Sequence, residues 1–160
     1  MCVLSTSVVL NPFAVKIFPA MWSLTGLRSG LRVLVVDSNA DSRDLLIILF
    51  EEYGVEAIAA DCVSEALKIM QHNPPDLVIS ELALPREDGY SLIRHIKALE
   101  LAHNLHIPTI ALTGCTTANN RIQSLAAGFC KHLSKPVNLD ELIAAVACVT
   151  NFGQAVTAYQ

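Results

Sequence analysis

The chain has 160 residues, of which 52% are hydrophobic and 16% are charged, and its formal net charge is -4. This length fits one domain with a short appendage, and the apolar composition fits a core shared between helices and a sheet buried on both faces. The sequence has no basic tract, so we expect no nucleic-acid binding by this chain alone.

Residues 1–30 form an apolar extension that is interrupted by Pro12, Lys16 and Pro19. The segment lacks the run of about 18 apolar residues that crosses a membrane, and it lacks the basic start and cleavage site of a secretory signal. Two interpretations stay open. The extension is a loosely ordered leader, for which Met21 offers a later start, or it is an arm that docks on the domain, a partner or a membrane surface. Membrane contact is the least favoured of these.

The folded domain is predicted to span residues 31–150. Residues 31–36 are apolar and rich in valine, which predicts a first strand that ends at Asp37. Helix-capping chemistry is provided by Ser38, Asn39 and Asp41, and a helix is predicted to follow to about residue 53. Its predicted buried face consists of large side chains at helical spacing: Leu45, Leu46, Leu49, Phe50 and Tyr53.

Gly54 predicts the end of that helix, and residues 55–60 predict the second strand. A second helix is predicted from about Cys62, and the prolines at positions 74–75 stop it. The apolar residues of this helix recur at helical spacing: Val63, Ala66, Leu67 and Met70.

A short apolar run, Leu77–Ile79, predicts a third strand that is buried on both faces. Glu81 comes where this strand ends, and an irregular segment closed by Pro85 and Gly89 follows it. In an open parallel sheet, ligands bind beyond the carboxyl ends of the strands. A carboxylate at that place is therefore a stronger candidate for a functional site than one on a helix face.

A third helix is predicted over residues 90–102, and a fourth strand over residues 107–112, ending at Thr113. Residues 114–120 are predicted to form a polar loop, and a short helix is predicted over residues 121–127.

The fifth strand is predicted over residues 130–134, directly before Lys135 and Pro136. Residues 138–141 form a capping-box pattern that starts the last helix. The predicted buried residues of that helix are apolar: Leu139, Leu142, Ile143 and Val146. Residues 151–160 are predicted to be a loose tail.

The five cysteines are widely scattered: Cys2, Cys62, Cys115, Cys130 and Cys148. None of them has the spacing of a metal ligand to another cysteine or to a histidine, and their odd number argues against a disulfide framework. We therefore expect reduced, mostly buried thiols and a cytoplasmic protein.

Strands and helices thus alternate five times, which predicts an α/β fold with a doubly wound parallel sheet. Four strand ends carry chemically specific side chains: Asp37, Glu81, Thr113 and Lys135. Groups at this edge of a parallel sheet converge on one pocket. Two carboxylates beside an ammonium can hold a divalent cation or form a closed ion pair, and a hydroxyl with an ammonium can hold phosphate oxygens. The set suggests acyl-phosphate chemistry on a carboxylate.

Five short motifs follow one another along residues 31–150: Val33–Asp37, Pro75–Val78, Pro85 with Asp88-Gly89, Ile107-Pro108 with Ala111–Thr113, and Lys135-Pro136. In this order they resemble the receiver domain of bacterial two-component response regulators, of the stand-alone chemotaxis type. The resemblance implies a flavodoxin-like fold with sheet order 2-1-3-4-5, two helices on one face and three on the other. It also implies a cis peptide bond before Pro136.

The resemblance further implies that Glu81 is in the phosphoacceptor position, and that Asp37, Ser38 and the backbone carbonyl of Ala83 are in the metal-binding positions. It implies a set of switch and phosphate-contacting positions: Thr113, Gly114, His132 and Lys135. The chain departs from the family at Ser38, where a second acid is usual, and at Glu81, where aspartate is usual. The longer side chain displaces its oxygens by about 1 Å, and one acid is lost, so we expect only weak Mg²⁺ binding and no catalytic residue.

Two further questions stay open in the sequence. Glu81 is expected to reach toward Lys135, which would fix the domain in either an active-like or a resting state. His132 stands where the family often has an aromatic residue that turns inward, and histidine titrates near neutrality. A switching role and a half-exposed ring without any role are both compatible with this position.

Three functions follow from these observations. The favoured one is a non-enzymatic pseudo-receiver that binds a sensor kinase or a downstream protein through residues 121–127, His132 and residues 139–149, with a homodimer left open. The alternative is a phosphorelay receiver that accepts phosphate with Mg²⁺ on Glu81, or on Ser80, although Ser80 should point to the other face of the sheet. An unrelated nucleotide-binding enzyme has no support, because no glycine-rich phosphate loop follows any predicted strand.

Overall fold

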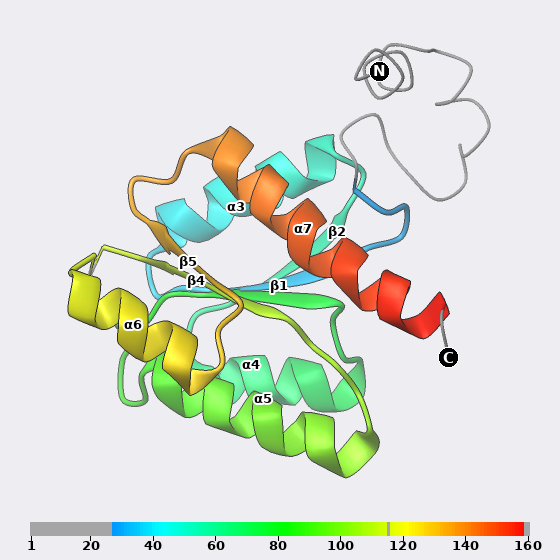
Figure 1. Ribbon diagram of the computed structural model, residues 1–160. Coiled ribbons are helices and arrows are strands. Elements are labelled where there is room, and N and C mark those ends of the chain that lie inside the picture. The colour runs from blue at the N-terminus through cyan, green and yellow to red at the C-terminus, as the bar shows by residue number, and fades with distance from the viewer. Residues whose placement is uncertain (1–26, 115, 159–160) are drawn as a thin grey trace, which may run out of the picture.

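The computed structural model describes residues 27–114 and 116–158, and in this part of the chain five strands form one sheet (Figure 1). The strands are β1 Arg32–Val36, β2 Glu56–Ala60, β3 Leu77–Ser80, β4 Thr109–Thr113 and β5 Lys131–Ser134. Neighbouring strands pair in parallel in the order β2-β1-β3-β4-β5, which confirms the predicted sheet. The predictions for residues 1–26 and for Cys115 lie outside the described residues.

In the same part of the chain, the helices are α3 Ala40–Glu52, α4 Val63–His72, α5 Gly89–His103, α6 Ala118–Ala127 and α7 Leu139–Ala158. Helices α3 and α7 cover one face of the sheet, and α4, α5 and α6 lie on the other, as predicted (Figure 1). Among the described residues, no helix has both the length and the apolar composition needed to cross a bilayer.

Both faces of the sheet are buried, because successive residues of a strand point to opposite faces. Val33 and Val35 of β1 pack under α3 and α7, whereas Leu34 and Val36 pack against α4 and α5. Every side chain of β3 is buried. A slip of one residue would exchange the two faces, so this burial fixes the register and with it the height at which each strand ends.

The buried face of α3 differs in part from the predicted one. Leu46, Leu49 and Phe50 are buried, and Tyr53, just after the helix, is half-buried. Leu45 is 47% exposed, so the prediction that it is buried is wrong. An amphipathic helix lays one stripe of residues on a sheet, and Leu45 lies beside that stripe.

Helix α7 differs from the prediction at both ends. Leu142, Ile143 and Val146 are buried as predicted, but Leu139 is 38% exposed, because no preceding turn covers the first residue of the helix. The helix continues to Ala158, so the prediction of a loose tail is wrong for residues 151–158. The sequence there has no proline, and each residue added to a running helix gains a hydrogen bond.

Helix α6 begins at Ala118 rather than at residue 121, because the side chain of Thr117 accepts a hydrogen bond from the N–H of Asn120 at 3.2 Å. The prediction of mostly buried thiols is wrong for the described cysteines. Cys62 is half-buried, and Cys130 and Cys148 are exposed. Cysteine is small enough to lie on the solvent side of a helix or at a strand end, so its hydrophobic character alone did not decide its burial.

The start of α5 holds the loop after β3 in place. The carboxylate of Asp88 accepts a hydrogen bond from the N–H of Ser91 at 2.9 Å, and the N–H of Gly89 donates to the carbonyl of Leu82 at 2.9 Å. A Cβ atom on Gly89 would lie 2.6 Å from the carbonyl oxygen of Glu81, so only glycine fits here. This close approach fixes the backbone at Glu81.

Candidate functional site

The carboxyl ends of the strands bring together the side chains that the sequence singles out. Asp37 follows β1, Glu81 follows β3, Thr113 ends β4, and Lys135 follows β5. The N–H of Lys135 donates to the carbonyl of Thr113 at 2.9 Å, which ties the ends of β4 and β5 together. The predicted convergence of the two carboxylates and the ammonium is confirmed by two ion pairs.

Lys135 lies between the two carboxylates, and we call these three residues the Lys135 cluster. Its Nζ atom is 2.6 Å from Oδ2 of Asp37 and 2.9 Å from Oε2 of Glu81. The side chains of Asp37 and Glu81 are only 5% and 9% exposed. Removing two carboxylates from water is costly, and the shared ammonium offsets part of that cost.

The carboxylate of Glu81 has partners on both oxygens. Oε2 meets Lys135, and Oε1 accepts hydrogen bonds from the N–H of Leu82 at 2.7 Å and of Ala83 at 3.1 Å. Burial alone would raise the pKa of Glu81. Hydrogen bonds from Thr113, Lys135 and Ala83 outweigh burial and hold that pKa below its usual value. Glu81 is therefore ionised at neutral pH.

The pKa of Lys135 shifts in the opposite direction to that of Glu81, which also favours the charged form. Burial alone would lower it, but hydrogen bonds to Asp37 and Glu81 outweigh burial and raise the pKa of Lys135 above its usual value. Both shifts favour the charged forms. At pH 7 the Lys135 cluster is therefore a closed ionic contact, and neither Glu81 nor Lys135 is poised to transfer a proton.

Asp37 makes a second set of contacts that hold it at the start of α3. Its Oδ1 atom accepts a hydrogen bond from the N–H of Asn39 at 2.9 Å, and its backbone carbonyl accepts one from Nη1 of Arg43 at 2.7 Å. The side chain of Asn39 caps the helix by accepting from the N–H of Ser42. Sequence reasoning missed Arg43. Arg43 lies in the first turns of a capped helix that follows Asp37, and this position could have predicted a contact between the two residues.

The residues present do not fit a Mg²⁺ site in this arrangement. The ion needs several oxygen ligands in octahedral geometry. Each carboxylate oxygen of Asp37 and Glu81 already meets a protein donor. Ser38 is exposed and carries no charge, so it supplies no second carboxylate. The cation of this site is the ammonium of Lys135.

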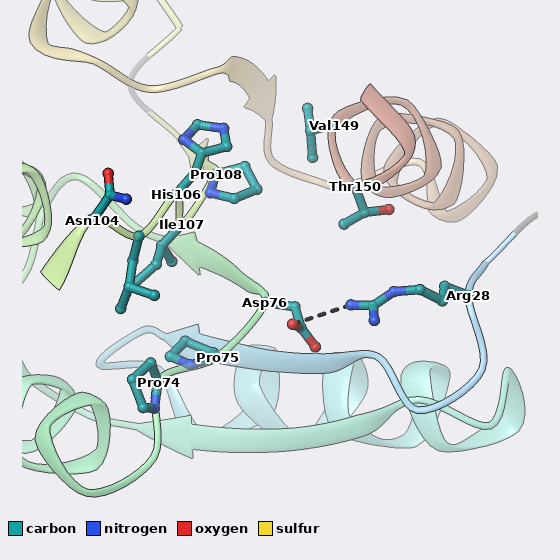
Figure 2. A pocket seen from close by; sticks show the side chains of 11 residues that line it. Arg28, Pro74, Pro75, Asp76, Asn104, His106, Ile107, Pro108, Val149 and Thr150 are labelled. Carbon is teal, nitrogen blue, oxygen red and sulfur yellow. Dashed lines mark ion pairs between the residues drawn. The ribbon is translucent and has the colours of Figure 1, made fainter. Parts of the chain in front are cut away.

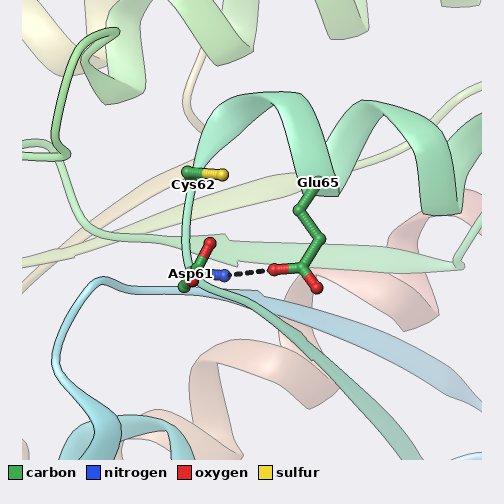
Figure 3. A group of neighbouring side chains, drawn as sticks. All are labelled: Asp61, Cys62 and Glu65. Atoms are coloured by element: carbon green, nitrogen blue, oxygen red, sulfur yellow. Dashed lines mark hydrogen bonds between the residues drawn. The ribbon is translucent and has the colours of Figure 1, made fainter.

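A second group of possible metal ligands lies at the start of α4, where the ligand atoms of Asp61, Cys62 and Glu65 are within 4.8 Å of one another (Figure 3). Glu65 accepts a hydrogen bond from the N–H of Asp61 at 2.8 Å, which is helix-capping geometry. A hydrogen bond from Cys62 lowers the pKa of Asp61. The carboxylates are exposed and the contacts are those of a helix start, so we assign this group to capping.

His132 of β5 is buried at 5% exposure, so the half-exposed ring left open by the sequence is excluded. The hydroxyl of Ser124 donates to the carbonyl of Arg121 at 2.9 Å, and its oxygen is 2.8 Å from Nδ1 of His132. A hydroxyl has one proton to donate, so Nδ1–H must donate to Ser124. The Nε2 atom of His132 is then a bare acceptor, buried and without a partner among the described residues.

The environment of His132 favours its neutral form. Burial lowers the pKa of His132, the nearby charge of Arg121 lowers it further, and Glu81 opposes them only in part. Sequence reasoning identified His132 but missed Ser124. A serine inside a helix pattern carries no signal that it will meet a histidine from a strand.

We expect His132→Phe to weaken the dependence of the free energy of unfolding on pH below about pH 6.5. A folded-state pKa below the ordinary value of 6.5 means that the unfolded chain binds the extra proton first. The wild type should therefore lose stability as pH falls below about 6.5, with a slope from this residue of at most about 1.4 kcal/mol per pH unit.

Urea unfolding from pH 7.5 to 5 would measure the slope in His132→Phe and in the control His72→Phe, which replaces an exposed ring on α4. An equal change of slope in both variants would contradict the assignment to burial of His132.

Two other implied positions lie beside the Lys135 cluster. The peptide bond between Lys135 and Pro136 is cis, as the resemblance implies. Gly114 follows Thr113 and is exposed at the same edge of the sheet.

Comparison with known proteins agrees with this fold. The profile of the family described as "Response regulator receiver domain" matches residues 33–147. A Leptolyngbya boryana protein of 14.6 kDa, encoded in the sodA1 3' region, is 38% identical over 111 residues, covering 69% of this chain and 83% of that protein. The phosphate regulon transcriptional regulatory protein PhoB of Pseudomonas aeruginosa is 32% identical over 120 residues, covering 75% of this chain but only 52% of PhoB. A receiver domain structure from Clostridium thermocellum has a TM-score of 0.71 and 27% identity, covering 79% of this chain and 98% of that chain.

Proposed function

Because the chain belongs to the response regulator receiver domain family, we propose that it is a signalling module that acts without phosphorylation, with Glu81 in the phosphoacceptor position. The observation that carries this proposal is the set of donors around Glu81. Its carboxylate already binds the ammonium of Lys135 and the N–H groups of Leu82 and Ala83. Donors of these kinds are the ones that would hold the oxygens of an incoming phosphoryl group.

The same contacts argue against Glu81 as a nucleophile. In-line transfer needs a carboxylate oxygen that is free and aimed at the phosphorus atom, and an error of about 1 Å can cost about 100-fold in rate. Both oxygens of Glu81 are held by protein groups. Ser38 supplies no second acid for a metal that would neutralise the phosphoryl charge.

We further propose that the module binds a sensor kinase or a downstream signalling protein through the exposed sides of α6 and of the first half of α7, with His132 buried behind α6 rather than on that surface. Ile122 is 66% exposed and Leu125 is 43% exposed on α6, and Leu139 is 38% exposed on α7. Helix α6 precedes and α7 follows the edge strand β5, and large exposed apolar side chains beside it are candidate contacts for a protein partner. The alternative is that this surface binds a second copy of the chain, and a measurement of molecular mass in solution would detect such a homodimer.

The alternative is a working phosphorelay receiver, which the family and the retained Thr113 and Lys135 favour. Treatment with acetyl phosphate and Mg²⁺, followed by intact mass spectrometry, separates the two functions. We expect no gain of about 80 Da, whereas a phosphorylatable receiver domain treated in parallel should gain it. An adduct of that mass that disappears in Glu81→Ala would overturn the proposed function.

A further inference from the structure

A cavity of about 420 Å³ opens at the amino-terminal edge of the sheet, the edge opposite the Lys135 cluster (Figure 2). Segments that are far apart in the sequence line it: Arg28 before β1, residues 74–76 before β3, residues 104–108 before β4, and residues 149–150 on α7. Its volume lies in the range of about 300–1,000 Å³ that is usual for small-molecule sites.

The walls of this cavity are mainly apolar and stiff. Pro74, Pro75, Ile107, Pro108 and Val149 supply them. Proline has a fixed φ angle, and Pro75, Ile107 and Pro108 are buried, so the walls need little ordering when a ligand enters. Such a surface suits a flat or branched apolar group.

One guanidinium group reaches into the cavity from Arg28 and meets Asp76 (Figure 2). Its Nη2 atom is 3.1 Å from Oδ1 of Asp76, and Oδ2 of Asp76 accepts a hydrogen bond from the N–H of Arg32 at 2.9 Å. Asp76 therefore uses both oxygens to hold Arg28 and β1. The Arg28 side chain is 30% exposed, and a guanidinium has five N–H donors in a rigid fork that matches a carboxylate.

The segment before β4 is also held in place. The carboxylate of Glu100 accepts a hydrogen bond from the N–H of Ile107 at 2.7 Å, and the same oxygen is 3.3 Å from Nδ1 of His106. Asn104 ends α5 in the left-handed conformation, with φ of 51°. These contacts fix the side of the cavity that faces Arg28, so the site is formed before any ligand binds.

We propose that this cavity binds a small organic carboxylate with an apolar body. The carboxylate lies on the guanidinium of Arg28, and the apolar body lies between the proline walls and Val149. The site shares no residue with the Lys135 cluster. It therefore goes beyond the proposed signalling function, and its binding can be measured whether or not that function is correct.

The test is a titration of the full ¹⁵N-labelled chain with 2-naphthoate to about 5 mM, a range that detects millimolar affinity. We expect saturable shifts of the amide signals of Asp76, Thr150 and residues 104–107. The neutral analogue 2-naphthamide should bind about tenfold more weakly, because it cannot form a charge-assisted pair with Arg28. Absence of saturable shifts, or shifts centred on another surface, would overturn the proposal.

Two variants and one control sharpen the test. Arg28→Gln removes the fork, and Val149→Trp fills the cavity without touching Arg28, so either alone should weaken 2-naphthoate binding at least about tenfold. Arg94→Gln makes the same chemical change at an exposed position on α5 and should bind like the wild type. The amide spectrum itself reports whether each variant is folded. Undiminished binding in a folded Arg28→Gln or Val149→Trp protein refutes the site.

Discussion

Replacing Lys135 by methionine should lower the free energy of unfolding at pH 7 by about 3 kcal/mol. The variant keeps the length and the apolar stem of the side chain but removes the ammonium that meets Asp37 at 2.6 Å and Glu81 at 2.9 Å. Two buried carboxylates then face each other without a cation. Breaking a buried ion pair from one side costs more than the pair contributes, because the remaining charge stays out of water.

The pH dependence of this loss follows from the shifts in pKa. Glu81 has a folded-state pKa below its usual value near 4.5, so its stabilising contribution is present above that value and is lost as pH falls through the folded-state pKa. The folded-state pKa of Lys135 is raised above 10.5, so its contribution is present at pH 7 and is lost only in strong alkali. The difference between wild type and Lys135→Met should therefore be largest near neutrality and should narrow below about pH 4.5.

Urea unfolding at pH 7 and pH 4 measures both effects. The matched control is Lys97→Met on α5, which removes an ammonium that pairs with Glu100 at 3.1 Å and is 38% exposed. A pair this exposed should contribute less than about 1 kcal/mol. Equal losses for the two lysines, or a loss at residue 135 that does not depend on pH, would show that the Lys135 cluster is not the buried ionic contact described above.

The sheet could be predicted because its signals are local and strong. The run Leu77–Ile79 and the valines of β1 are apolar on both faces, and only a strand covered by helices on both sides buries such a run. Once the strands are parallel, their carboxyl ends meet at one edge, so the proximity of Glu81 and Lys135 follows from the topology. The individual hydrogen bonds within the site could not be predicted from the sequence in the same way.

What the sequence could not provide depends on how side chains fill space. Leu46 is buried and Leu45 is exposed. Both leucines fit a helical repeat of apolar residues, so the sequence alone does not tell which of them faces the sheet. The hydrogen bond between Ser124 and His132 joins α6 to β5 and has no sequence pattern. The cavity at Arg28 arises where three connections end beside α7, and connections leave little periodic signal.

Restoring the two family aspartates, by Ser38→Asp together with Glu81→Asp, should create the Mg²⁺ affinity that the present residues do not support. The shorter side chain at position 81 can no longer reach the N–H groups of Leu82 and Ala83 in the same way, which frees its oxygens. A second acid at the exposed position 38, beside Asp37, adds a charged oxygen ligand, so Mg²⁺ can compete with the ammonium of Lys135.

Isothermal titration calorimetry should give a dissociation constant for Mg²⁺ at least about tenfold lower in this double variant than in the wild type. The control, Ser38→Asn with Glu81→Asp, keeps the size of the new side chain but withholds its charge, and should recover only part of the gain. Circular dichroism establishes that each variant is folded. If the folded double variant binds Mg²⁺ no better than the wild type, then charge and side-chain length at positions 38 and 81 are not what excludes the ion.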